Sequence, residues 1–156
     1  SDTYYGILSN GRDTHIKGNV TSVWNSAIHN SGGFMAFEGI AHSIGTGSGG
    51  NSFGFEISGG TALINNSKIM STDPGGPEAG DAISIYGSAP NLTIDNSLMI
   101  SNGTGSRSIG DQGILLNVTI LRTSYANKTK SSLITLIGGS LIIDPNLNVS
   151  SPIPTG

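Results

Sequence analysis

The sequence contains no cysteine, so neither disulfide bonds nor thiolate metal sites can stabilise the fold. Charged residues are also scarce. They make up 11% of the chain, against about a quarter in an average globular domain. The seven Lys and Arg residues are scattered and the net charge is −3, which excludes a basic surface for nucleic acid. No apolar run approaches the roughly 18 residues needed to span a membrane.

Sequence signatures of nucleotide and zinc sites are missing as well. The glycine-rich run 45–51 lacks the lysine of a phosphate-binding loop, so it predicts a surface loop. The histidines do not have zinc-ligand spacing, and we interpret them as isolated loop or edge residues. These are His15, His29 and His42. We expect no cofactor.

Paired carboxylates could still perform glycoside chemistry across neighbouring strands. Glu56 lies between Phe55 and Ile57, and Asp95 follows Ile94, so both acids are predicted to point away from the core. Outward acids usually form the polar face of a half-buried strand, which favours a non-enzymatic protein. The full set of candidate acids is Glu38, Glu56, Asp81, Asp95 and Asp111.

Glycine is abundant, at 24 residues, and it separates short runs in which apolar and polar residues alternate. The segment 80–101 is the clearest example. Three short strands are predicted around Ile83, Ile94 and Met99, with a break at 87–90 and a turn at 96–97. Asn66 and Asn96 fall at matching places in successive repeats, which predicts a ladder of hydrogen-bonded asparagine side chains.

The same pattern recurs along the whole chain, at intervals of 21 to 30 residues, as in solenoid proteins. We therefore predict one domain over residues 1–156, with 150–156 as a C-terminal tail or strap. The predicted inward stack is Ile7, Ile28, Ile57, Ile85, Leu115 and Leu136. A second inward face is predicted from Ile16, Phe37, Leu63 or Ile64, Ile94, Ile120 and Ile142.

The motif G-x-A-I-x-I-x-G…L-T-I-x-N-S-x-x-x-S at 80–101, repeated more loosely at 55–71, resembles right-handed parallel β-helices. It is most similar to passenger domains of bacterial autotransporter adhesins and to phage tailspike shafts. The resemblance implies an all-β fold, a right-handed parallel β-helix (β-solenoid) of about six irregular coils, in an extracellular, cell-surface or virion-surface setting. The alternative fold is a jelly-roll β-sandwich, since alternating strands with glycine-rich turns suit both.

Asn-X-Ser/Thr occurs seven times, where composition predicts about three occurrences. One interpretation is a glycosylated surface protein. The other is that an asparagine turn followed by a threonine-containing strand recurs because the structural repeats recur. The candidate residues are Asn19, Asn65, Asn91, Asn102, Asn117, Asn127 and Asn148.

Three acids in the loop 73–81 form a weak candidate calcium site, because carboxylate oxygens are the ligands that Ca²⁺ prefers. They are Asp73, Glu78 and Asp81, and their spacing matches no known calcium motif, so a solvated loop is the preferred interpretation. The first residue is Ser1 rather than methionine, which suits a processed secreted protein or a fragment.

The function expected from these features is that of a structural or adhesive surface protein, for example a self-assembling filament subunit. Tyr4, Tyr5 and Trp24 are candidates to cover the first repeat, but both ends also carry apolar residues. Terminal repeats normally need polar caps, so we expect the chain to form homo-oligomers through its ends. A carbohydrate or host-surface ligand is a further expected partner. The alternative is a fragment of a polysaccharide-binding or polysaccharide-degrading tailspike or lyase.

Overall fold

The computed structural model describes residues 5–45, 52–72, 80–101, 109–111, 115–121, 124–127, 134–135 and 140–143. These residues form strands and turns, with no helix among them. The strands are β1 (Ile7–Ser9), β2 (Thr14–Ser22), β3 (Ile28–Ser43), β4 (Phe55–Asn65), β5 (Lys68–Ser71), β6 (Ile83–Ile85), β7 (Ser88–Asp95), β8 (Leu98–Ser101), β9 (Ile109–Asp111), β10 (Leu115–Leu121), β11 (Ser124–Asn127), β12 (Ile134–Thr135) and β13 (Ser140–Ile143).

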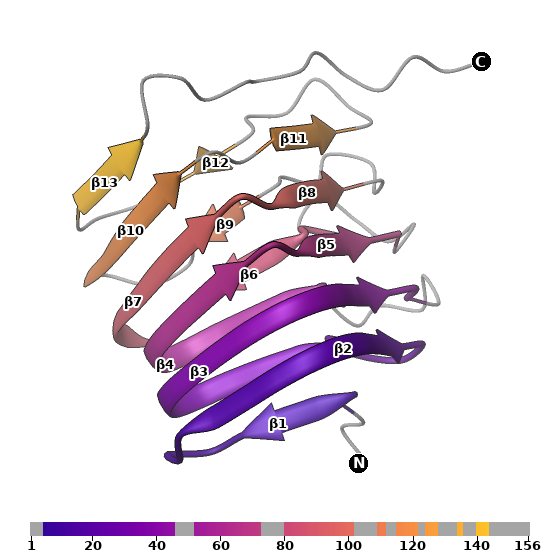
Figure 1. Ribbon diagram of the computed structural model, residues 1–156, viewed down its shortest axis with the longest axis horizontal. Coiled ribbons are helices and arrows are strands. Elements are labelled where there is room, and N and C mark those ends of the chain that lie inside the picture. The colour runs from indigo at the N-terminus through magenta and orange to yellow at the C-terminus, as the bar shows by residue number, and fades with distance from the viewer. Residues whose placement is uncertain are drawn as a thin grey trace.

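All described strand pairs are parallel, and together they make one sheet that curls into a half-barrel (Figure 1). Each pass of the chain, which we call a layer, adds strand segments to three rows. Row A contains β1, the start of β3, the start of β4, β6, β9 and β12. Jelly-roll sandwiches are built from antiparallel strands, so the alternative fold is wrong.

Row B contains β2, the middle of β3, the end of β4, β7, β10 and β13. Row C contains the ends of β2 and β3, followed by β5, β8 and β11. The segment 80–101 contributes β6, β7 and β8, one strand to each row, which confirms the three strands predicted there. Because long-range parallel pairs dominate, every strand depends on a neighbour from another pass of the chain.

The register of row A differs from the predicted stack. Ile28 pairs with Phe55 rather than Ile57, and Ile85 pairs with Asp111 rather than Leu115. Ile57 and Ile85 do pair with each other, two residues beyond the observed column and on the same face. The predicted Leu115 is not in row A, because it begins β10 and pairs with Ser88 of β7. Leu136 lies outside the described residues. The observed column in row A is Ile7, Ile28, Phe55, Ile83, Ile109 and Ile134.

The register of row B confirms most of the second predicted face. Phe37 pairs with Ile64, which decides between Leu63 and Ile64. At the last strand the prediction was displaced by one residue, because Ile120 pairs with Ile143 and the side chain of Ile142 is 60% exposed. The observed column is Ile16, Phe37, Ile64, Ile94, Ile120 and Ile143.

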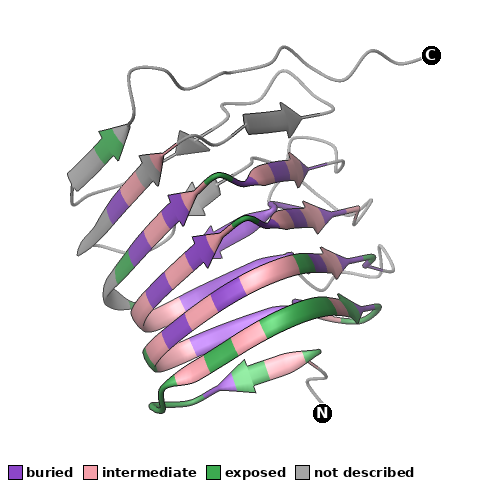
Figure 2. Ribbon diagram, viewed as in Figure 1, coloured by how far each residue is buried: buried purple, intermediate pink, exposed green. Residues whose placement is uncertain are grey.

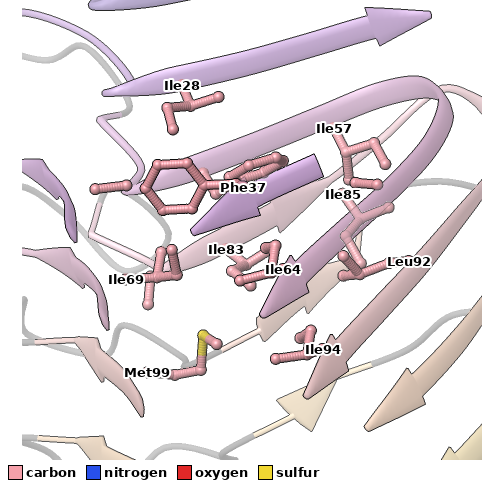
Figure 3. Packing of buried hydrophobic residues seen from close by; sticks show 14 of the residues in the cluster. Ile28, Phe37, Ile57, Ile64, Ile69, Ile83, Ile85, Leu92, Ile94 and Met99 are labelled. Carbon is pink, nitrogen blue, oxygen red and sulfur yellow. The ribbon is translucent and has the colours of Figure 1, made fainter. Parts of the chain in front are cut away.

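The concave side of the sheet is filled by one continuous cluster of apolar side chains from the three rows (Figure 3). Ile57, Ile83 and Ile85 from row A meet Ile64 and others from row B, and all of these are fully buried. Row C contributes Ala41, Ile69 and Met99. Full burial of one such side chain contributes about 1.5–3 kcal/mol, so this cluster is the main source of stability.

The corner between rows B and C is built in two ways. In β2 and β3 the strand continues through a glycine, and a Cβ on Gly39 would lie 1.9 Å from the carbonyl oxygen of Gly18. In the following layers the corner contains Asn66 and Asn96, which have positive φ angles of 48° and 44°. Asn96 Nδ2 donates to Asn66 Oδ1 over 2.6 Å, which confirms the predicted asparagine ladder at these two positions.

A column of serines lies at the end of row C and closes three of the layers. Ser22, Ser43, Ser71 and Ser101 are in register, and all four are buried. Ser71 Oγ donates to the carbonyl oxygen of Ser52 over 2.9 Å, and Ser52 lies three residues before β4. The equivalent bonds join Ser43 to Asn25 and Ser101 to Gly80, also three residues before row A begins. Thus the end of row C is tied to the start of row A within one layer.

The first layer is covered less well than the layers that follow it (Figure 2). Ile16 and Val20 of β2 are only partly buried, whereas Phe37 and Ala41, their partners on β3, are at most 2% exposed. Trp24 is 66% exposed and so does not cover this end as predicted. The described residues of β2 pair with β3 alone, which leaves one edge of β2 open.

Candidate functional site

A buried polar cluster lies on row A, on the convex side of the sheet, next to the apolar core. His29 of β3, Glu56 of β4 and Ser84 of β6 are in register with one another. They alternate with the core residues Ile28, Phe55 and Ile83, so their side chains point away from the core. Nevertheless they are buried, with exposed fractions of 7%, 5% and 1%. The prediction that Glu56 belongs to a solvated polar face is therefore wrong, and His29 is not an isolated loop or edge residue.

Two aromatic rings and a serine hold the imidazole of His29. The Tyr5 ring centroid lies 4.6 Å from that of His29, and the Tyr86 ring centroid lies 6.1 Å away. His29 Nε2 is 2.8 Å from Ser58 Oγ and 3.4 Å from the Tyr86 hydroxyl. Because the ring is packed and hydrogen-bonded, its edge that carries Nε2 is fixed toward Ser58.

Glu56 is held in the same cluster by hydroxyl donors. Ser26 Oγ donates to Glu56 Oε2 over 2.5 Å, and the Tyr86 hydroxyl also hydrogen-bonds to this carboxylate. A buried carboxylate that accepts charge-assisted hydrogen bonds keeps its charge at lower cost than one without partners. Tyr86 thus links the negative charge of Glu56 to the imidazole of His29.

Ser58 is placed by a β-bulge between rows A and B. Asn30 pairs with Ile57 and the next residue, Ser31, pairs with Gly59, so Ser58 is the extra residue of β4. A bulge bends the strand and turns the side chain of the extra residue in a new direction. The carbonyl of Ile57, just before the bulge, accepts a 2.9 Å hydrogen bond from the backbone N–H of Tyr86. The same local geometry therefore positions both Ser58 and Tyr86 beside His29.

Burial dominates the electrostatics of this cluster. It lowers the pKa of His29, and the nearby charge of Glu56 acts in the opposite direction. Burial also raises the pKa of Tyr86, and its hydrogen bond to Glu56 adds to this effect. The pKa of Tyr5 is raised by burial and then by Glu56. At neutral pH the cluster thus holds a neutral imidazole and two protonated tyrosines.

Two polar atoms of the cluster have no hydrogen-bond partner among the described residues. They are His29 Nδ1 and Ser84 Oγ, and both are buried. A buried polar group without a partner costs about 1–3 kcal/mol. A polar cluster that retains such a cost next to an apolar core is a candidate functional site.

The other candidate acids occupy different positions in the fold. Glu38 forms an ion pair with Lys17, with 3.0 Å between Oε1 and Nζ, and both side chains are exposed. Asp95 is half-buried at the end of β7 in row B, and Asp111 is on β9. Asp81 is fully buried just before β6, while Asp73 and Glu78 lie outside the described residues.

Among the residues that the structure describes, no three His, Asp or Glu side chains gather as a metal site. His15 lies on β2 and is exposed, and its ring packs 5.6 Å from that of Phe34. His42 is on β3, where Nε2 is 3.1 Å from Thr72 Oγ1. The described part of the chain also contains no helix that is long and apolar enough to cross a membrane.

The described sequon asparagines fall on strands. Asn19 and Asn91 are exposed and Asn65 is half-buried, whereas Asn117 pairs with Asn91 in the next layer of row B. Thr93 and Thr119 pair as well, so these two sequons are one structural position repeated. This favours the interpretation that part of the excess arises from repetition. Asn127 is on β11, and Asn102 and Asn148 lie outside the described residues.

A shallow groove of about 250 Å³ crosses the outer face of row B. It runs over β2, β3 and β4, where Lys17 and Glu38 flank the small side chain of Ala36. Leu63 and Asn65 complete its outer wall. The groove offers cationic, anionic and amide groups next to apolar surface, a combination that suits a polar ligand.

No protein-family model matches this chain, and neither the curated proteins nor the solved structures include a match to it.

Proposed function

We propose that this chain is a non-enzymatic structural or adhesive module of an extracellular or virion surface protein, and that its copies assemble end to end. The proposed fold is a right-handed parallel β-helix of about six irregular coils, as in the surface proteins that the sequence resembles. In this proposal the layers provide a rigid stack, and the first layer provides a surface for a second copy of the chain.

Two features support the β-helix. The columns of rows A and B continue in register from the first strands to the last, as stacked coils require. The serine bonds from Ser43, Ser71 and Ser101 join the end of a layer to its own beginning, which is the contact that closes a coil. Self-similar layers of this kind contact only their neighbours, so stacking can be continued by another copy.

The open edge of β2 is the observation that most favours assembly. Its core-facing residues Ile16 and Val20 are half-exposed, and Leu8 beside it is 53% exposed. A row of unpaired backbone groups next to apolar side chains is a template for another strand. At the other end Ile142 is 60% exposed on β13. Leu147 and the proposed tail 150–156 lie outside the described residues.

Blocking one backbone N–H on the open edge tests this proposal. Ile44 N donates to Ser22 O, so Ser22 faces β3 and the adjacent Thr21 faces the open edge. Thr21→Pro removes an edge donor without removing a bond to β3, a position where strands tolerate proline. We expect sedimentation velocity to show oligomers of the unmodified chain, and smaller oligomers or monomers of Thr21→Pro.

Thr21→Val is the matched control, because it keeps the N–H and removes the same hydroxyl and the same sequon threonine. It should assemble like the unmodified chain. If the unmodified chain stays monomeric at high concentration, the proposal of end-to-end assembly is wrong. A monomeric adhesive module is then the remaining interpretation. If Thr21→Pro assembles as well as Thr21→Val, the edge of β2 is not the contact.

The groove across row B favours a second candidate function, the binding of a carbohydrate. Lys17, Glu38 and Asn65 supply donors and acceptors for sugar hydroxyls, and Leu63 supplies apolar surface. We expect the double variant Lys17→Ala/Glu38→Ala to lose binding on a glycan array, while Lys68→Ala, outside this groove, retains it. We also expect acidic polysaccharides to stay uncut. Cleavage that is abolished by Glu56→Gln or Asp95→Asn would instead favour the tailspike or lyase alternative.

A further inference from the structure

We propose that Ser58 and His29 form a nucleophilic pair that accepts an acyl group from a small activated ester, with Glu56 stabilising the imidazolium formed during the transfer. The proposal concerns one acyl transfer onto Ser58 and is independent of end-to-end assembly. It rests on the hydrogen bond between Ser58 and His29, on the bulge that places Ser58, and on the charge and hydroxyl groups behind the imidazole.

The geometry required of a nucleophile and its base is present. Ser58 Oγ lies 2.8 Å from His29 Nε2, within the range in which an imidazole can accept a hydroxyl proton. Ser58 is partly exposed, whereas His29 is buried. An ester can therefore reach the hydroxyl while the base is shielded from water. The bulge is a further sign, since bulges direct side chains at functional positions.

The position of the imidazole is fixed by the residues packed around it. The rings of Tyr5 and Tyr86 restrict its rotation, at centroid distances of 4.6 and 6.1 Å. We assign the neutral tautomer with the proton on Nδ1, which leaves Nε2 free to accept. Tyr5 and Tyr86 are positioning residues in this arrangement.

The acyl transfer balances without a further reactant. As Ser58 Oγ forms a bond to the carbonyl carbon of the ester, the hydroxyl proton moves to His29 Nε2. The bond between that carbon and the leaving oxygen then breaks, and the same proton passes to the leaving group. The products are O-acyl Ser58 and an alcohol or phenol. No electron is transferred to or from an external group.

The charge that develops on His29 has a partner in place. The imidazolium formed after proton uptake lies near the carboxylate of Glu56, to which Tyr86 and Ser26 donate hydrogen bonds. Opposite charges in a buried site attract more strongly than in water. Glu56 therefore acts on the imidazolium through its charge and not through contact with the ester.

Acetylation by p-nitrophenyl acetate tests the pair. Intact-mass measurement followed by peptide mapping of the full chain should find the acetyl group on Ser58 before it appears on other serines. His29→Gln should slow acetylation of Ser58 by about 10²- to 10⁴-fold, the usual contribution of a general base. The rate on Ser58 should rise with pH as His29 loses its proton and should level off by neutral pH.

Ser31→Ala is the matched control, because Ser31 is on the neighbouring strand and its hydroxyl donates to Ser9 O rather than to a histidine. Its Ser58 should be acetylated at the unmodified rate. Mapping on the unmodified chain keeps the test valid even if His29→Gln does not fold. Equal acetylation of many serines, no acetylation of Ser58, or an unchanged rate in folded His29→Gln would each overturn the proposal.

Discussion

At the scale of the residue, His29 shows how burial controls a titratable group. Its imidazole is 7% exposed and packed between two tyrosine rings, so the charged form is disfavoured and the pKa is lowered. Glu56 offsets this effect in part through its charge. The pKa of His42 is also lowered, by burial and then by Lys68.

These shifts predict that the protein is less stable in mild acid than at neutral pH. An unfolded histidine has a pKa of about 6.5, whereas folded His29 takes up its proton only at lower pH. The contribution of His29 to stability is therefore fully present above about pH 6.5 and is lost as the pH falls toward the lowered pKa, because the unfolded chain binds the extra proton. The melting temperature, measured between pH 5 and 8, should fall with acidification less in His29→Gln than in the unmodified chain.

A non-titratable exposed residue provides the control for this prediction. Thr21→Ala on β2 should keep the pH dependence of the unmodified chain. An equal slope in His29→Gln and the unmodified chain would mean that His29 has no role in the pH dependence. His42 should retain some of the dependence in the His29 variant.

Only part of the cluster around His29 could be predicted from sequence. Alternation correctly placed Glu56 opposite Phe55 and Ile57. Burial of an outward residue depends on what covers it, and here Tyr5 and Tyr86 come from distant parts of the chain. The extra residue at Ser58 was also missed, since a bulge is defined only by the partner strand. The available signal was a polar residue directly after a core residue, as in Ile28–His29, Phe55–Glu56 and Ile83–Ser84.

At the scale of the element, the corners between strands determine where rows end. Asn66 and Asn96 adopt positive φ angles, which asparagine tolerates better than other residues with a Cβ except aspartate. Their turn could be predicted because the Asn-Ser pair recurs. By contrast, Gly18 and Gly39 let β2 and β3 continue through the same corner. This difference depends on the close contact between the backbones of the two strands at these glycines, which the local sequence does not predict.

The asparagine corner yields a prediction with two variants at one position. Asn96→Ala should lower the free energy of unfolding by about 1–2 kcal/mol, because alanine is strained at φ 44° and cannot donate to Asn66. Asn96→Gly removes the same hydrogen bond without the strain and should lose less. Urea denaturation measures both. A glycine variant as unstable as the alanine variant would show that strain is not the reason for asparagine here.

The serine column supplies a second prediction for an element. Ser71→Ala leaves the carbonyl of the buried Ser52 without this donor and should lower the free energy of unfolding by about 1–3 kcal/mol. Thr21→Ala on the exposed side of β2 is the control and should change stability little. The measurement is urea denaturation. Equal stability of Ser71→Ala and Thr21→Ala would show that this hydrogen bond does not close the layer.

At the scale of the whole molecule, the sequence repeat predicted that the strands stack in columns, but it did not predict which residues pair. Most apolar residues were assigned to the correct face. Ile142 was not, because a one-residue slip moves a side chain to the other side of the sheet. A two-residue slip preserves the face, so alternation could not decide between Ile57 and Phe55 as the partner of Ile28. The loops between layers differ in length, and only pairing of the strands themselves fixes the register.

The core makes the strongest prediction for the molecule as a whole. Ile85 is 0% exposed, in the middle of the apolar cluster, and is in register with Ile57 (Figure 3). An aspartate there would place a carboxylate among apolar side chains, at a cost of several kcal/mol against a total stability of about 5–15 kcal/mol. Because each layer supports the next, we expect Ile85→Asp to unfold the chain rather than one strand, with loss of the β signal in circular dichroism.

Ile142→Asp is the matched control for this core variant. Ile142 is 60% exposed on β13, so the same change of side chain leaves the new carboxylate in contact with water. We expect this variant to stay folded and soluble. If Ile85→Asp is also folded, with the melting temperature of Ile142→Asp, then Ile85 does not lie in the core and the register of rows A and B is wrong.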